Sequence, residues 1–314
     1  MMKVDNNNDF VKKNPNLTII GGSGGMGKVF GRYFKRHGFE VTIYARNKER
    51  LRDVAIEMGV AFETSLERSV NNADIVMVTI PINSTPEIIK KIGPYLKENA
   101  LIFDITSIKK SVFEALEDLK NTFPVNCISF HPMFGPGIKD MKNYVMLVLK
   151  IGGTDKYDVF VNGILEIFRS DGLFITETSP DIHDKRIALT LGVPHMLNIL
   201  FLNLLKNAKE PLNELTKYTG TTFLLQKVFA ESIIQREMEM FGEIQMENQQ
   251  FLAILEMFEK LVKDYRKSIE NKDMKSFSEI FSKGLDYSRE DNHFEKSYKY
   301  FYEFMKILKG ESKK

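Results

Sequence analysis

The sequence has a single cysteine among 314 residues, and its charges almost cancel, with 44 Lys and Arg against 42 Asp and Glu. One cysteine excludes a disulfide framework and a zinc or iron–sulfur site built on cysteines, and it favours a reducing, cytoplasmic location. A net charge of +2 provides no large basic field for nucleic acid or an anionic membrane. We therefore expect neither of them as a partner.

Long hydrophobic runs are scarce as well. Residues 1–16 form a polar tail without the apolar core of a signal peptide. The most apolar later stretch, residues 197–205, contains Asn198 and Asn203 and is too short and polar to span a bilayer. The chain is nevertheless 43% hydrophobic, with 24 Phe, which is enough to build a core and excludes a disordered chain. Its length, about twice that of a common domain, predicts two domains.

Apolar runs alternate with amphipathic segments in the first half of the chain. The runs predict strands near residues 17–20, 39–44, 74–80, 101–105, 125–130, 144–149 and 173–177. Strands that alternate with helices indicate right-handed crossovers and a doubly wound parallel sheet covered on both faces. After residue 179 long helices replace the strands. We therefore predict an α/β domain at 17–179 and an all-helical domain at 180–314, part of whose apolar surface is buried against a second subunit.

A glycine cluster follows the first expected strand and opens a helix. It matches the pattern G-x-G-x-x-G with Gly22, Ser23, Gly24, Gly25, Met26 and Gly27. Glycines allow a tight turn and a close approach of the backbone to a pyrophosphate, whose charge is stabilised at the helix N-terminus. The cluster predicts a Rossmann-type domain that binds a dinucleotide, with Ile80 and Pro81 also lining the site. The alternative is a glycine-rich turn that serves packing alone.

The residues after the second strand bear on which dinucleotide binds. NAD sites place Asp or Glu there for the ribose 2′-hydroxyl, whereas this chain has Ala45 followed by Arg46 and Asn47. A carboxylate would repel a 2′-phosphate, and an arginine pairs with one through two hydrogen bonds. The pattern favours NADP, with NAD possible. If Arg46 is only a solvated surface residue, the protein would not discriminate between the two cofactors.

Two polar groups are expected at the carboxyl ends of later strands, where open α/β sheets bind ligands. His131 begins HPMFGP at 131–136, directly after a strand, and Ser107 lies in DITSIK at 104–109. A histidine beside a nicotinamide can take the proton of a carbinol as hydride leaves, because its pKa lies near working pH. A hydrogen-bonded surface histidine is the competing interpretation.

Together these motifs resemble the prephenate dehydrogenases of tyrosine biosynthesis, and archaeal-type members most. The similarity extends over residues 17–260 and rests on GGSGGMG at 21–27, on DITSIK and HPMFGP, and on His183 and Asp184 followed by His195. The resemblance implies an NAD(P)-dependent oxidoreductase acting on CH–CH donors, which converts prephenate into 4-hydroxyphenylpyruvate by oxidative decarboxylation. It also implies a helical second domain that binds substrate and forms the homodimer.

The resemblance assigns roles to individual residues. His131 would accept a hydrogen bond from the ring hydroxyl of the substrate and act as the base, and Ser107 would bond the same hydroxyl. His195 would line the substrate pocket. His183 opens its helix, and we interpret it as structural.

The sequence departs from the family pattern at two places. LGVPH at 191–195 lacks the usual serine, and Leu224 stands where the bacterial enzymes place an arginine that binds a prephenate carboxylate. Because buried carboxylates need partners, other cations must replace that arginine, and the candidates are Lys109, Arg186, Lys227 and Arg236. The departure leaves arogenate as an alternative substrate.

Two further functions remain open on the same fold, because fold alone does not determine function. One is a different small reductase with the same two-domain plan, although the HPMFGP motif speaks against it. The other is a non-catalytic NADP-binding protein, which would bind cofactor without turnover.

Overall fold

The computed structural model describes residues 14–310, so most of the predicted polar tail lies outside the described residues. The chain forms two compact units. The first comprises the chain up to Ile187 together with Gly242–Asn248, and the second comprises Ala188–Phe241 and the chain from Gln249 on. The domain limits at 179 and 180 stay a prediction, because this division falls a few residues later and returns one short segment to the first unit.

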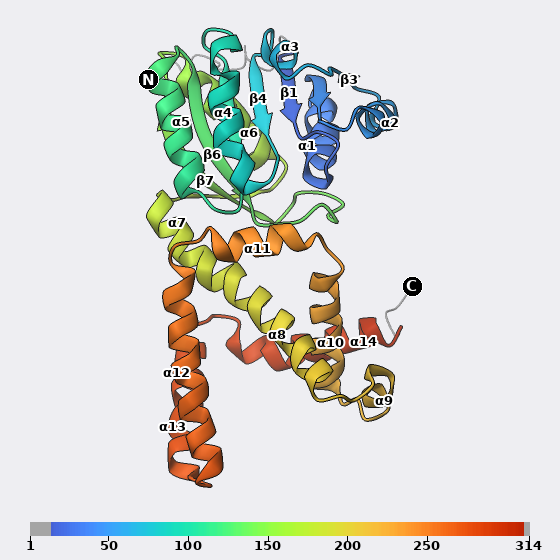
Figure 1. Ribbon diagram of the computed structural model, residues 1–314, viewed down its shortest axis with the longest axis vertical. Helices are drawn as coiled ribbons and strands as arrows, with labels where there is room; N and C mark the ends of the chain where they lie inside the picture. The colour runs from blue at the N-terminus through green and yellow to red at the C-terminus, as the bar shows by residue number, and fades with distance from the viewer. Residues whose placement is uncertain (1–13, 311–314) are drawn as a thin grey trace, which may run out of the picture. The chain divides into compact units, whose positions relative to one another are not determined.

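The first unit contains an eight-stranded sheet in the order β3-β2-β1-β4-β5-β6-β7-β8 (Figure 1). The strands are β1 (Asn16–Ile20), β2 (Glu40–Tyr44), β3 (Ala61–Phe62), β4 (Ile75–Val78), β5 (Leu101–Asp104), β6 (Asn126–Pro132), β7 (Val145–Gly152) and β8 (Phe174–Glu177). The first six are parallel and follow the Rossmann order, with its reversal between β1 and β4. This part of the predicted fold is confirmed.

The parallel pairing does not extend to one edge of the sheet. Strand β7 runs antiparallel to β6, and β8 is parallel to β7. The connection between β6 and β7 contains no helix, and a parallel pair needs a long crossover that is usually helical. The chain therefore turns back after the HPMFGP motif.

Helices cover both faces of the sheet. The α-helices of this unit are α1 (Gly25–Arg36), α2 (Lys48–Met58), α3 (Leu66–Val70), α4 (Thr85–Ile92), α5 (Lys110–Thr122), α6 (Tyr157–Ser170) and α7 (Pro180–Ile187), with 3-10 turns η2 (Ile82–Ser84) and η3 (Gly93–Tyr95). Alternation along β4 divides the core: Ile75 and Met77 pack with α1, α2 and α6, whereas Val76 and Val78 pack with α3, α4 and α5.

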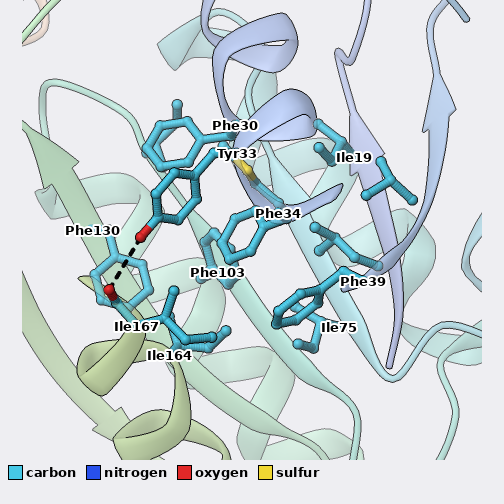
Figure 2. Close-up of a cluster of buried hydrophobic side chains, with 14 of the residues drawn as sticks. Ile19, Phe30, Tyr33, Phe34, Phe39, Ile75, Phe103, Phe130, Ile164 and Ile167 are labelled. Carbon is cyan, nitrogen blue, oxygen red and sulfur yellow. Dashed lines mark hydrogen bonds between the residues drawn. The ribbon is translucent and has the colours of Figure 1, made fainter. Parts of the chain in front are cut away.

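Aromatic rings dominate the core beneath α1 (Figure 2). Phe34 is fully buried, and its ring centroid lies 5.0 Å from Phe39, 6.1 Å from Phe168 and 6.4 Å from Phe103. These partners come from the α1–β2 turn, α6 and β5. One side chain of α1 therefore joins segments that are far apart in the sequence and fixes the helix on the sheet.

The second unit is helical throughout its described residues, as predicted. Its elements are the π-helical turn η4 (Ala188–Gly192), α8 (Val193–Asn207), α9 (Leu212–Lys217), α10 (Thr221–Ile234), α12 (Phe251–Glu270), α13 (Met274–Ser288), η5 (Phe294–Lys296) and α14 (Ser297–Leu308). Helix α11 (Met238–Met246) begins here and continues into the first unit from Gly242. Many large apolar side chains are exposed in this unit, among them Leu204, Leu252 and Phe281.

The helical stretch that contains residues 197–205 is longer than the sequence suggested. Helices α7 and α8 join through η4 into one helical stretch, Pro180–Asn207, of 28 residues. By length and composition this stretch is sufficient to cross a membrane, whereas residues 197–205 taken alone are too short. The core helix of a soluble protein meets the same criterion, so the stretch on its own assigns no membrane.

Replacement of Phe34 tests the aromatic core. We expect Phe34→Ala to lower the free energy of unfolding by about 3–5 kcal/mol, because it removes a buried ring and leaves a cavity. Ile56→Ala, at a position 72% exposed on α2, is the control and should change it by less than about 0.5 kcal/mol. Urea unfolding followed by circular dichroism measures both, and equal midpoints for the two variants would contradict the packing described here.

Candidate functional site

The glycine loop lies between β1 and α1 at the point where the strand order reverses. A Cβ atom on Gly22 would lie 2.5 Å from Cβ of Ile43, and one on Gly27 would lie 2.6 Å from the carbonyl oxygen of Gly21. No side chain caps the N-terminus of α1. The loop is therefore a cradle of bare backbone in front of a helix N-terminus, which fits the pyrophosphate of a dinucleotide.

Gly25 serves a different purpose from its neighbours. A Cβ atom there would lie 3.0 Å from Cβ and Cγ of Pro136, which belongs to the HPMFGP motif. In the same loop the ring of Phe134 lies 6.3 Å from Phe30 of α1. The connection after β6 thus packs directly on the start of α1, and it brings the histidine motif and the glycine loop together.

The two residues predicted to select the cofactor have different environments. Asn47 caps α2, because its side-chain oxygen accepts the N–H of Arg50 at 3.0 Å. Arg46 is exposed beyond the end of β2. Asn47 therefore has a structural role as a helix cap. Of the two residues, Arg46 has the charged side chain that can pair with an anionic ligand group.

His131 lies buried near the end of β6, in a chain of three polar side chains. Its Nδ1 lies 2.9 Å from Nε2 of His183, and Nδ1 of His183 lies 2.7 Å from Oδ1 of Asp184. The Asp184 carboxylate also accepts the backbone N–H groups of Lys109 at 2.9 Å and Lys110 at 3.1 Å. It therefore caps α5, which has no capping side chain at its own N-cap residue.

This arrangement determines where the imidazole protons lie. Burial holds the pKa of His131 well below 6.5, and the charge of Lys109 and the one that His183 carries when protonated lower it further. Burial also lowers the pKa of His183. Both rings are therefore neutral near pH 7. A neutral His183 that donates from Nδ1 to a carboxylate must accept at Nε2, so His131 donates from Nδ1. Nε2 of His131 is then left as an unprotonated acceptor.

Lys109 is part of a second buried network. Its ammonium donates to Oδ2 of Asp104 at 2.6 Å and to the carbonyl oxygen of Phe130 at 2.7 Å. Asp104 also accepts the N–H of Thr106 at 2.7 Å and the hydroxyl of Ser129 at 2.5 Å. Lys109 is fully buried, and these contacts join the ends of β5 and β6. This environment does not support the prediction that Lys109 binds a substrate carboxylate.

The other predicted site residues are divided between the units. Ser107 is half-buried in the loop after β5, and Arg186 lies on an exposed part of α7. His195, Lys227 and Arg236 lie in the second unit. The structure therefore groups Ser107 with His131 at one edge of the sheet, and the assignment of His195 and Arg236 to the same pocket stays a prediction.

His195 has an unusual environment within the second unit. Its ring meets that of Phe241 edge-on at a centroid distance of 4.7 Å, and burial lowers its pKa. Among the described residues, its buried Nδ1 has no hydrogen-bond partner. A buried polar atom without a partner is costly, so this histidine is suited to bind a polar ligand group.

Sequence reasoning missed two residues of this site. Asp184 appears only as part of the family motif, and its contact with α5 spans 75 residues. Glu243 was not singled out at all, although its carboxylate accepts the N–H of Ile82 at 2.8 Å. A carboxylate that caps a distant helix leaves no local sequence pattern. For Asp184 the available sequence signal was that α5 lacks a capping residue of its own.

The fold and the glycine cradle define a Rossmann-type dinucleotide-binding protein with a helical second unit. Residues 30–146 match the nucleotide-binding domain of prephenate dehydrogenase, and residues 179–283 match its dimerization domain. The chain belongs to the prephenate dehydrogenase family.

Relatives agree with this assignment. The chain is 32% identical over 270 residues to a "Probable arogenate/prephenate dehydrogenase" from Methanocaldococcus jannaschii, an alignment that covers 85% of this chain and 60% of the relative. It is 28% identical to the "T-protein" of Haemophilus influenzae, with 86% and 66% covered. The chain thus spans about two thirds or less of the length of these curated relatives. The predicted resemblance to archaeal members is confirmed.

Solved structures share the fold. A prephenate dehydrogenase from Aquifex aeolicus in complex with hydroxyphenyl propionate and NAD+ gives a TM-score of 0.70 at 23% identity, over 88% of this chain and 97% of that one. A Synechocystis arogenate dehydrogenase gives 0.65 at 17% identity, over 88% and 100%. Both structures therefore share the fold of this chain.

Removal of the Lys109 ammonium tests whether this residue is structural. We expect Lys109→Met to lower the free energy of unfolding by about 3 kcal/mol or more, because it leaves the buried Asp104 carboxylate without its cation. Lys139→Met, at an exposed position in the β6–β7 connection, should have almost no effect. Urea unfolding of the two variants decides the matter, and equal stability would show that the buried pair contributes little.

Proposed function

We propose that this chain is an NADP-preferring prephenate dehydrogenase, which oxidises and decarboxylates prephenate to 4-hydroxyphenylpyruvate in tyrosine biosynthesis. The observation that carries the proposal is the buried chain of Asp184, His183 and His131. It presents an unprotonated ring nitrogen at the strand ends beside the glycine cradle. Family membership supports the same reaction class.

The cofactor would be held by residues whose geometry suits it. The glycine loop would receive the pyrophosphate, Ile80 and Pro81 would line the other side of the crevice, and Arg46 would pair with a 2′-phosphate. When bound, the nicotinamide accepts the hydride. NAD+ is present in the Aquifex aeolicus complex, and the preference of this chain for NADP rests on Arg46.

In the proposed mechanism His131 handles the proton. Its Nε2 accepts a hydrogen bond from the ring hydroxyl of prephenate, with Ser107 bonding the same hydroxyl. As the hydride leaves the carbon that bears this hydroxyl, the hydroxyl proton passes to Nε2. Loss of the ring carboxylate as carbon dioxide then leaves the aromatic phenolate, which recovers the proton. Aromatisation drives the reaction, so alignment and one proton transfer are the main requirements.

The substrate carboxylates require cations from other residues. We assign this role to Arg186 and Arg236, because Lys109 is engaged with Asp104, and His195 would line the pocket as a neutral hydrogen-bonding ring. Lys227 faces Glu231 at 3.7 Å and is the weaker candidate. With Leu224 in the place of the family arginine, arogenate is the second candidate substrate, and two of the relatives are named for it.

The proposal extends to assembly and location. The match to a dimerization domain and the exposed apolar side chains of the second unit support a homodimer formed through the helices. We place the protein in the cytoplasm. A non-catalytic NADP-binding protein is the alternative from another functional class, and a turnover assay separates the two.

The turnover assay uses purified protein with prephenate or arogenate and with NADP or NAD, and follows the absorbance of the reduced cofactor. We expect turnover with prephenate, and we expect His131→Asn to lower kcat by about a hundredfold or more because the general base is lost. Cofactor binding should remain intact in this variant. Ile56→Ala, far from the strand ends, serves as the control for handling and folding.

The outcomes of this assay separate the candidates. Turnover with arogenate alone would identify arogenate as the substrate. No turnover with either substrate, together with intact NADP binding, would favour the non-catalytic protein. For the wild type, kcat/KM should stay level as pH falls through 6.5, because the pKa of His131 lies well below that value. An acid limb centred at 6.5 or above would contradict the described environment of His131.

Arg46 is tested separately. We expect wild-type kcat/KM to be higher with NADP than with NAD, and Arg46→Ser to lower the value for NADP by about tenfold, the cost of one charge-assisted contact. The value for NAD should change little. Arg52→Ser, at an exposed position on the adjoining α2, controls for loss of a nearby charge. Equal effects of the two substitutions on NADP would assign the preference to general electrostatics instead of Arg46.

A further inference from the structure

We propose that Glu243 is a positioning residue of the cofactor crevice, which it shapes by holding the loop after β4. The carboxylate comes from the part of α11 that belongs to the first unit. Its Oε2 accepts the N–H of Ile82 at 2.8 Å, and its Oε1 accepts Nδ2 of Asn83 at 3.2 Å. The inference rests on the proposed function only in that a dinucleotide occupies the crevice.

The loop needs an acceptor from elsewhere in the chain. Its helical part begins with η2 at Ile82, and the preceding Pro81 has no side chain that can cap it. Thr85 is fully buried at the start of α4, but its hydroxyl donates to the carbonyl oxygen of Pro81 at 3.0 Å and so does not cap. Because a buried N–H requires a partner, Glu243 supplies the cap that the local sequence lacks.

The same loop forms one wall of the crevice. Gly21 has φ +85°, and a Cβ atom there would lie 2.2 Å from the carbonyl oxygen of Thr79 and 2.8 Å from Cγ2 of Ile80. The backbone after β4 thus rests directly on the first residue of the glycine loop. Since the crevice at the β1 and β4 reversal is where such sheets bind dinucleotides, a shift of this loop changes the cofactor site itself.

A second contact holds the segment that carries Glu243 in place. Five residues later, Nδ2 of Asn248 donates to the backbone carbonyl oxygen of Asp184 at 2.8 Å, and Asn248 is buried. The segment Gly242–Asn248 is therefore attached to the first unit at two points. One attachment reaches the cofactor loop, and the other reaches the residue that orients His183. The position of the carboxylate is thus set independently of the cofactor.

The test measures cofactor binding without substrate. NADPH binding is followed by the fluorescence of its nicotinamide, which suits this chain because it contains no tryptophan. We expect Glu243→Ala to weaken NADPH binding about tenfold, as for the loss of one hydrogen bond to a charged group. Glu243→Gln keeps an amide oxygen for Ile82 and should lose less. Glu239→Ala, exposed in the first turn of α11, is the matched control and should bind as the wild type does.

Steady-state kinetics distinguish positioning from a general loss of structure. In Glu243→Ala the KM for the cofactor should rise in parallel with the dissociation constant, while kcat and its acid limb, which depend on His131, stay unchanged. Unaltered NADPH affinity would overturn the inference, whether or not kcat is lower. Tighter binding would also overturn it, because the carboxylate would then act by repelling the pyrophosphate.

Two further results keep the test decisive. If Glu243→Ala does not fold, Glu243→Gln and Asn83→Ala, which removes one of the two hydrogen bonds at an exposed position, carry the measurement, and unchanged affinity in both overturns the inference. A wild type that binds NADPH but does not oxidise prephenate or arogenate refutes the proposed function alone. A wild type that binds neither NADPH nor NADH refutes both proposals.

Discussion

The carboxylate of Asp184 is the group on which the site depends most. Oδ1 accepts from Lys109 N–H and from His183, and Oδ2 accepts from Lys110 N–H. The first role caps α5 and so fixes the turn that carries Ser107. The second fixes the proton positions of two imidazoles and leaves Nε2 of His131 ready to accept. One buried anion thus determines both the place of Ser107 and the protonation pattern of His131, the proposed base.

Two buried polar networks lie at the ends of β5 and β6, and the cost of burying their ionisable groups is offset in different ways. Asp104 and Lys109 are a charged pair with well-satisfied hydrogen bonds, a condition that buried ion pairs require. The two imidazoles instead satisfy each other as neutral rings, because burial disfavours their charged forms. The Lys109 cation adds to this by lowering the pKa of His131 further. Lys109 therefore influences the pKa of the proposed base, although its own ammonium is engaged with Asp104.

Sequence reasoning recovered what is local. The strand–glycine–helix order and the strand-end position of His131 follow from short patterns, and each is present. It failed at two of the strands. The reversal of β7 depends on the absence of a helix between β6 and β7, and β3, with only two residues, is too short for periodicity to reveal.

The way the helices are capped explains why the site could be predicted only in part. Helices α2 and α3 are capped by their own residues, Asn47 and Ser65. The turns that lead into α4 and α5, which border the crevice and the histidine chain, are instead held by Glu243 and Asp184. These carboxylates come from much later in the chain, so the strand ends reach their final geometry only when α7 and the segment Gly242–Asn248 have packed against them. The cofactor crevice and the proposed base are therefore coupled to the packing of α7 and of the segment Gly242–Asn248.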